Sequence, residues 1–142
     1  MKLKITNETS KLKSVVLGLP NSMGPAHSLE DSYDAKSYHS LQNGIYPQEK
    51  AIADEMTAFE KVLKKHDVEV YRPHLIENYN QVFARDVAFV IDDKMIISNI
   101  IQDRYDEQDA YRKIFARVGW KKIINLPDSA HIEGGDVIVW ND

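Results

Sequence analysis

The sequence predicts an α/β fold, and three observations lead to this class. Short apolar runs rich in β-branched residues alternate with longer segments that have helical periodicity. Two β-rich runs flank the turn sequence DDK at residues 92–94, which is typical of a hairpin. Two similar stretches, beginning at Arg85 and at Gly134, lie 49 residues apart. A spacing of this size indicates repeated supersecondary units.

The first half of the chain reads as strand, loop, helix and strand. The run at 14–20 is apolar and β-branched and predicts a buried strand. Residues 21–47 have no clear periodicity, so we expect either a binding loop or lid, or a partly helical excursion on the surface. The run at 68–73 alternates along its length and predicts a second strand, which Pro73 ends.

The clearest helix is expected at 47–66. Pro47 suits its first turn, and the basic residues at its other end complement the helix dipole. Four apolar residues recur at helical spacing on one face, which we expect to pack on the core: Ile52, Met56, Phe59 and Leu63.

The second half contains a hairpin, a helix and two further strands. The hairpin is expected at 87–98 and the helix at 104–119, with Gly119 as its C-cap. The apolar side of this helix consists of Tyr111, Ile114, Phe115 and Val118. A strand is expected at 121–127, and another follows the glycine pair at 134–135.

Length and composition restrict the class of protein. The 142 residues fit one domain of common size, and 43% hydrophobic with 28% charged residues is typical of a soluble globular protein. A net charge of −4 argues against general binding to nucleic acid or to an anionic membrane, and no run is long and apolar enough for a membrane span. The absence of cysteine excludes a disulfide framework within the chain and is compatible with the cytoplasmic location that we expect.

Acidic residues stand at the start of both similar stretches. Asp86 follows Arg85 directly, and it either caps a turn, pairs with Arg85 or belongs to a functional site. Glu133 and Asp136 flank the glycine pair. On an ideal strand, residues three positions apart point to opposite faces. We therefore expect one of these two carboxylates in a cavity and the other in a structural role.

These motifs resemble a known family in their order and spacing. FARDVAFVIDDKMIIS is followed about one period later by HIEGGDVIVWND, and VEVYRP precedes both. Together they resemble the guanidino-group-modifying superfamily, which includes arginine deiminases, dimethylarginine dimethylaminohydrolases and amidinotransferases. The match runs from about Lys11 to the last residue and covers roughly the first half of a typical member.

The resemblance implies a fold and an activity. The fold is a partial five-bladed α/β propeller (pentein) of ββαβ repeats, with residues 1–142 as the N-terminal part of one catalytic domain and 21–47 in the place of a substrate-covering segment. The activity is hydrolysis at the guanidino group of arginine or an arginine derivative. A cysteine thiolate attacks the guanidinium carbon, an amine leaves, and water resolves the covalent amidino intermediate. The alternatives are an amidinotransferase, or a non-catalytic module that binds arginine-like cations or another protein.

The resemblance also implies roles for individual residues. Asp86 binds the substrate guanidinium, and Glu133 binds it and orients the catalytic histidine, because carboxylates on several sides match a planar cation. Arg104 is the nearest equivalent of an arginine that holds the substrate carboxylate. The competing interpretation is an exposed Arg104 at a helix start, paired with Glu107. Asp136 is the remaining substrate-binding candidate.

Two residue types that the family's chemistry needs are not in place. The chain has no cysteine. The family's catalytic histidine follows the position of Glu133, whereas all five histidines of this chain precede it: His27, His39, His66, His74 and His131. We expect His131 to be structural or to support the site. No histidine spacing predicts a metal site, and no cofactor is expected.

The final stretch raises a further expectation. The segment that begins at Arg85 continues into a return strand, whereas its counterpart stops at Asp142, at what would be the tip of a hairpin. We expect a missing C-terminal portion or a partner chain to supply both the nucleophile and the pairing strand. We also expect the 142-residue chain by itself to expose apolar surface or to self-associate, for example as a homo-oligomer.

Overall fold

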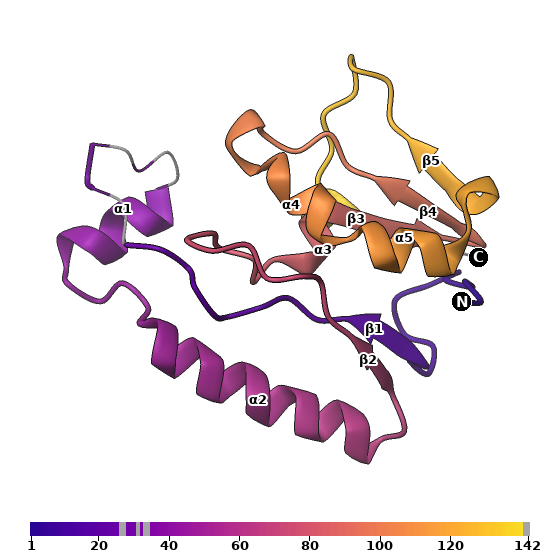
Figure 1. Cartoon of the computed structure of the whole chain (residues 1–142), viewed down its shortest axis with the longest axis horizontal. Coiled ribbons are helices and arrows are strands. Elements are labelled where there is room, and N and C mark those ends of the chain that lie inside the picture. Colours follow the sequence, from indigo (N-terminus) through magenta and orange to yellow (C-terminus); the bar gives the residue numbers. More distant parts are fainter. Residues whose placement is uncertain (26–27, 31, 33–34, 141–142) are drawn as a thin grey trace.

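The computed structural model describes residues 1–25, 28–30, 32 and 35–140, and it has a mixed α/β architecture (Figure 1). The elements of the first part are β1 (Ser14–Val16), α1 (Ala35–Gln42), α2 (Glu49–Lys65) and β2 (Glu69–Tyr71). Those of the second part are α3 (Ala84–Val87), β3 (Ala88–Ile91), β4 (Lys94–Ile97), η1 (Gln102–Arg104), α4 (Asp106–Ala110), α5 (Arg112–Val118), η2 (Trp120–Lys122), β5 (Ile123–Asn125) and η3 (Gly134–Asp136).

The first part forms a small parallel sheet with a helical crossover. β1 pairs with β2, and Val15 lies opposite Val70. Both predicted strands are confirmed but are shorter than expected, and β1 is half-buried along its length. α2 covers one face of this pair through a cluster that includes Leu17, Leu63 and Val68.

The predicted helix at 47–66 is confirmed as α2, but its apolar stripe is only partly covered. Leu63 is buried, and Met56 packs against the same cluster. Phe59 is 50% exposed, so its expected place in the core is wrong. A two-stranded sheet is too narrow to cover all of a helix face of this length, so the outer part of the stripe stays in contact with solvent.

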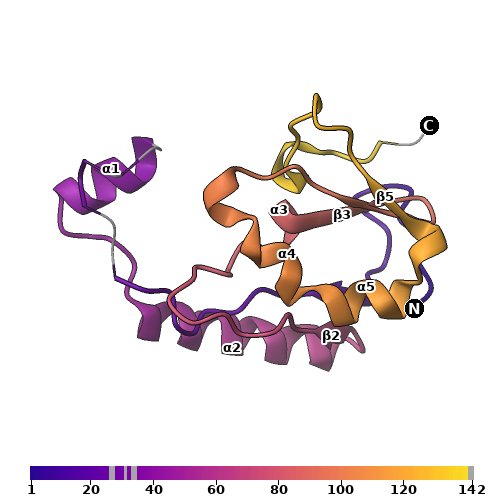
Figure 2. The same ribbon diagram turned by 45° about the horizontal axis from the view of Figure 1, so that its top comes forward.

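The segment at 21–47 contains the helix α1, in line with the expectation of a partly helical excursion. No described residue of α1 is buried. Figures 1 and 2 show α1 at one end of the molecule, away from the three-stranded sheet. Residues 26, 27, 31, 33 and 34, and with them His27, lie outside the described residues.

The second part forms a ββαβ unit. β3 and β4 make the predicted hairpin, in which Val90 lies opposite Met95 and Asp92 adopts a left-handed conformation with φ 51°. β5 then pairs parallel to β4, giving the strand order β3-β4-β5. The predicted strand at 121–127 is confirmed only as β5, since η2 precedes it.

The predicted helix at 104–119 is interrupted. It is divided into η1, α4 and α5, and the backbone leaves ideal helical geometry at Tyr111 (φ −93°, ψ −2°). Asp109, a poor residue for a helix interior, lies two positions before this point. The predicted apolar side is nevertheless correct, because Tyr111, Ile114, Phe115 and Val118 are all buried. Gly119 follows with φ 92°, as expected of a C-cap.

The main core lies between the two sheets. α5 packs against Met95 from the three-stranded sheet, and Val16 and Tyr71 reach the same cluster from the two-stranded sheet. Figure 1 shows α2 beside the β1–β2 pair, and Figure 2 shows α5 between these elements and the three-stranded sheet. Within the residues described, none of the helices combines the length and the apolar character needed to cross a membrane.

The strand expected after the glycine pair is not formed. Val137 has extended dihedral angles, but no described segment pairs with residues 137–140 in a ladder. Extended backbone counts as a strand only when a neighbour accepts and donates its hydrogen bonds. Ile138 and Trp140 are consequently 79% and 84% exposed, and only Val139 is buried.

Candidate functional site

The two similar stretches meet in space at their first residues. Both begin with a short helical turn, α3 in one case and η3 in the other, and these turns pack together. Gly134 lies so close to Arg85 that an added Cβ would stand 2.0 Å from the Arg85 carbonyl oxygen, so only glycine fits. Arg85 Nε also donates a hydrogen bond to the carbonyl oxygen of Gly134, at 2.7 Å.

This packing brings two of the predicted site residues together. Asp86 lies on α3 and Glu133 directly precedes η3. Asp86 Oδ2 is 3.1 Å from Nη1 of Arg104, and Glu133 Oε1 is 3.7 Å from the same nitrogen. Both carboxylates therefore converge on one guanidinium group, which belongs to Arg104.

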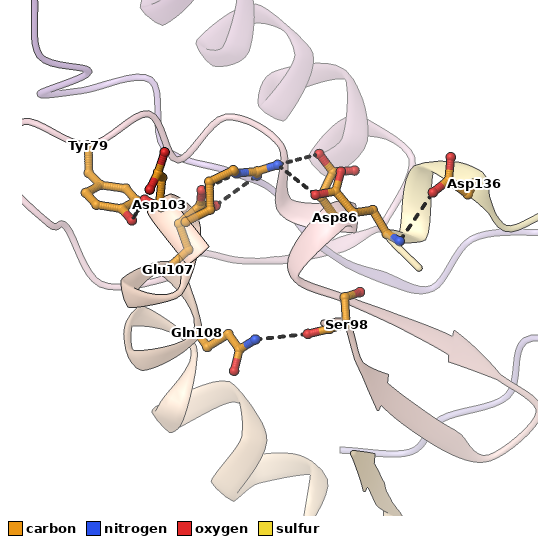
Figure 3. Close-up of polar contacts among 9 residues, drawn as sticks. Tyr79, Asp86, Ser98, Asp103, Glu107, Gln108 and Asp136 are labelled. Atoms are coloured by element: carbon orange, nitrogen blue, oxygen red, sulfur yellow. Dashed lines mark hydrogen bonds and ion pairs between the residues drawn. The ribbon is translucent and has the colours of Figure 1, made fainter. Parts of the chain in front are cut away.

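A third carboxylate holds this guanidinium from another side. Glu107 accepts two hydrogen bonds from Arg104, 2.6 Å from Nε and 3.1 Å from Nη2. Figure 3 shows Asp86 and Glu107 on opposite sides of the guanidinium. The predicted pairing of Arg104 with Glu107 is confirmed. The expected exposure of Arg104 is wrong, because its side chain is 15% exposed and that of Glu107 only 1%.

Burial and mutual charge shift the pKa values in this cluster. Burial alone would lower the pKa of Arg104, but the hydrogen bonds and negative charges of Glu107 and Asp86 outweigh it and raise the pKa, so Arg104 stays cationic. Burial raises the pKa of Glu107, and pairing with Arg104 opposes this shift. Burial also raises the pKa of Glu133, and the charges of Asp86 and Asp136 add to that rise.

Neighbouring polar contacts fix the segment that carries Arg104. The Tyr79 hydroxyl donates to the backbone carbonyl of Asp103, and Gln108 Nε2 donates to the carbonyl oxygen of Ser98 at 2.9 Å (Figure 3). The first contact holds η1, and the second ties α4 to the residue after β4. These contacts restrict the position of the backbone on both sides of Arg104.

Asp136 organises the turn beside the cluster. Its Oδ2 accepts a hydrogen bond from the backbone N–H of Glu133 at 3.3 Å, and the Glu133 side chain makes the reciprocal contact of a capping box. The two residues therefore do not alternate on a strand as expected, because the segment is a 3₁₀ turn. A contact of Asp136 with a substrate stays a prediction.

Arg85 does not pair with Asp86, which was one of the expected alternatives. It pairs with Glu8 at 3.0 Å and donates to the carbonyl oxygen of Val137 at 2.6 Å. Glu8 also accepts from the backbone N–H of Val139, at 2.9 Å. Glu8 and Arg85 thus fasten the segment that follows Glu133. The sequence contains no signal for the part that Glu8 plays, since it stands alone in a polar N-terminal stretch.

The other candidates lie outside the cluster. His131 is exposed, and across the described part of the chain no three histidine, aspartate or glutamate side chains are arranged to hold a metal ion. A hollow of about 280 Å³ is lined by Met23, Tyr46, Glu49 and neighbouring residues, but by none of the three carboxylates around Arg104. A covering role for residues 21–47 therefore stays a prediction.

Comparison of sequences finds a relative of undefined activity. No family model matches the chain. It is 28% identical over 136 residues to YkgA, an uncharacterized protein of Bacillus subtilis (strain 168). This match covers 95% of the chain but 45% of YkgA, so the chain spans less than half the length of the curated protein that it matches.

Comparison of structures finds the fold. An amidinotransferase of saxitoxin biosynthesis, SxtG from Microseira wollei, superposes with a TM-score of 0.67 at 22% identity, over 87% of this chain and 43% of that one. The inosamine-phosphate amidinotransferase StrB1 from Streptomyces griseus gives 0.65 at 18% identity, over 89% and 44%. A dimethylarginine dimethylaminohydrolase bound to S-methyl-L-thiocitrulline gives 0.61 at 16% identity, over 89% and 46%. The chain therefore has part of the α/β fold of the guanidino-group-modifying superfamily, the fold that its motifs resembled.

Proposed function

We propose that this chain supplies the guanidinium-binding carboxylates of an enzyme that acts on the guanidino group of arginine or an arginine derivative. Asp86 and Glu133 are the residues to which we assign this binding. The proposal includes a nucleophilic cysteine and a histidine from outside these 142 residues, carried by a further part of the polypeptide or by a partner chain. It also includes a cytoplasmic location.

One observation supports the proposal most directly. Asp86 and Glu133 are far apart in the sequence, yet both lie within 3.7 Å of one guanidinium nitrogen. The arrangement already accommodates a planar cation, since it surrounds that of Arg104. Arg104 donates its hydrogen bond to Oδ2 of Asp86, and the small Gly135 lies beside the other oxygen, Oδ1. We assign Oδ1 to the guanidinium of the substrate.

The chemistry assigns a limited task to these two carboxylates. They accept N–H hydrogen bonds from the substrate guanidinium and hold its central carbon in a fixed plane. The external thiolate then adds to that carbon, the bond to one nitrogen breaks, and the nitrogen leaves as an amine after taking up a proton. Water or an acceptor amine displaces the thiolate from the amidino group and completes the cycle.

Hydrolysis is the outcome that we propose, and amidino transfer is the alternative. The alternative draws support from SxtG and StrB1, both amidinotransferases, which superpose with the higher TM-scores. A module that binds arginine-like cations or a protein without turnover is a third candidate. It draws support from the absence of cysteine in the chain.

The substitution Glu133→Gln in the complete protein tests the proposal. It keeps the shape of the side chain and removes the charge, so turnover of a guanidino substrate should fall by about 100-fold or more. The melting temperature should change little, because Glu133 is one-third exposed. Amine release with and without an added acceptor amine separates hydrolysis from transfer.

Glu55→Gln is the matched control. Glu55 is an exposed residue of α2, far from the cluster in the chain, and its substitution should leave turnover unchanged. Equal turnover for Glu133→Gln and the wild type would reject the assigned role. Guanidinium binding without any turnover by the wild-type protein would favour the non-catalytic module.

A further inference from the structure

All three nitrogens of the Arg104 guanidinium donate hydrogen bonds to carboxylates of the protein. Glu107 takes up Nε and Nη2, and Asp86 takes up Nη1. Glu133 stands beyond Asp86 at 3.7 Å from Nη1. An arginine used to hold a substrate carboxylate needs a pair of parallel N–H groups that are free to face it. In Arg104 the pair formed by Nε and Nη2 faces Glu107, and Nη1, which would form the second pair with Nη2, donates to Asp86.

Release of Arg104 from Glu107 is strongly unfavourable. The Glu107 side chain is 1% exposed, and both of its oxygens accept hydrogen bonds from Arg104. If Arg104 turned toward a substrate, Glu107 would be left buried and charged without a counterion, which proteins tolerate poorly. The pair therefore acts as a fixed unit of the fold.

The charge balance of the cluster also opposes an anion. Three carboxylates surround one guanidinium, so with all three ionised two negative charges are uncompensated, and the exposed Asp136 lies next to them. A field of this sign attracts a cation and repels a carboxylate. It acts at short range, where salt screens it least.

A buried hydroxyl points to an uncommitted polar position at the same place. Tyr111 is 2% exposed, and among the described residues its hydroxyl has no hydrogen-bond partner. Burial and the negative charge of Glu107 raise the pKa of Tyr111, so the hydroxyl stays a neutral donor beside the cluster. Because this hydroxyl is neutral and inaccessible, it does not compensate the excess negative charge of the cluster.

We infer that the guanidino compound accepted by this site carries no free carboxylate for Arg104 to bind, and that Glu107 determines this specificity by holding Arg104. The inference rests on the proposed function and narrows its substrate class to decarboxylated, amidated or esterified relatives of arginine. Glu107 is a positioning residue here, since it acts on the ligand only through Arg104.

Binding of three ligands to the protein, measured by calorimetry, tests the inference. Arginine, argininamide and agmatine share the guanidinium and the carbon chain, but only arginine has a free carboxylate. We expect argininamide and agmatine to bind at least about tenfold more tightly than arginine. Argininamide keeps the size of arginine, so it separates the effect of charge from that of length.

The variant Glu107→Gln addresses the cause of the preference. It replaces one of the two oxygens that hold Arg104 by an N–H donor and removes one negative charge, so the tenfold gap between argininamide and arginine should narrow to about threefold or less. Asp109→Asn is the matched control. Asp109 lies two positions further along α4, is 68% exposed and pairs with the exposed Arg112, so its loss should leave the gap unchanged.

Each outcome decides between defined alternatives. Tighter binding of arginine than of argininamide overturns the inference and leaves the proposed function standing. A gap that is the same in Glu107→Gln and the wild type overturns the role of Glu107. If none of the three ligands binds, the proposed function fails and the inference fails with it. The ranking by the wild-type protein decides the substrate class even if Glu107→Gln does not fold.

Discussion

At the scale of single residues, the sequence identifies the members of the cluster around Arg104. It does not predict how they are arranged. Asp86, Glu133 and the Arg104–Glu107 pair all follow from motifs or helical spacing. Their burial does not, because the same i,i+3 spacing is common to exposed helix pairs. Glu107 lies near Asp86 and Glu133, which are distant in the sequence, so its environment depends on the tertiary fold. Burial is therefore the property that the sequence leaves open.

The raised pKa of Glu133 leads to a prediction about pH. Guanidinium binding needs the ionised carboxylate, and burial raises its pKa above the usual 4.5 despite the opposing charge of Arg104. As pH falls through that raised pKa, Glu133 takes up a proton and affinity for agmatine should fall. Agmatine stays cationic throughout this range, so the protein causes the change. Calorimetric titrations between about pH 7.5 and 4.5 measure it.

Glu133→Gln should make this pH profile shallower. The variant lacks one titrating carboxylate, so the slope of log affinity against pH should fall by up to about one proton. Glu107 also titrates in the cluster, so some slope should remain. The exposed Glu55→Gln variant should keep the wild-type profile. Identical profiles for all three proteins would mean that Glu133 does not contact the cation.

At the scale of elements, local patterns predict what local forces decide. The β3–β4 hairpin and α2 agree with the sequence, because alternation, turn residues and helical spacing lie within each of these segments. The strand predicted after the glycine pair depends on a pairing neighbour, and no described segment supplies one. Phe59 is likewise exposed because the sheet beneath α2 has two strands. In both cases the local sequence pattern is read correctly, and the error concerns the neighbouring element against which the segment would pack or pair.

The contact between α3 and η3 leads to a prediction about stability. A Cβ at Gly134 would stand 2.0 Å from the backbone oxygen of Arg85, which cannot move without shifting α3. Gly134→Ala should therefore lower the free energy of unfolding by about 2 kcal/mol or more, as measured by urea denaturation. It should also displace Glu133 from the cluster and weaken guanidinium binding.

Gly135→Ala is the matched control in the same turn. A Cβ at Gly135 would stand 3.1 Å from Oδ1 of Asp86, the end of a side chain that can adjust. Its cost in unfolding free energy should stay below about 1 kcal/mol. Equal losses of stability for the two variants would contradict the close packing of α3 and η3 as the cause.

At the scale of the whole molecule, two apolar regions differ in their burial: the core between the two sheets and the segment that follows η3. The core between the two sheets buries the apolar side of α5. The segment after η3 leaves Ile138 and Trp140 79% and 84% exposed, next to a backbone without a ladder partner among the described residues. Large exposed apolar side chains beside unpaired extended backbone favour association with another chain.

The 142-residue chain by itself should therefore self-associate through this segment. Its average mass in sedimentation velocity should rise over an approximately tenfold increase in protein concentration, because mass action favours contacts between exposed apolar groups. Replacing Ile138 and Trp140 together by serine should restore a monomer. The matched control replaces Tyr38 and Ile45 by serine. These residues are 44% and 65% exposed in or beside α1, and their loss should not change the association. A wild-type chain that stays monomeric throughout would show that the exposed segment needs no partner.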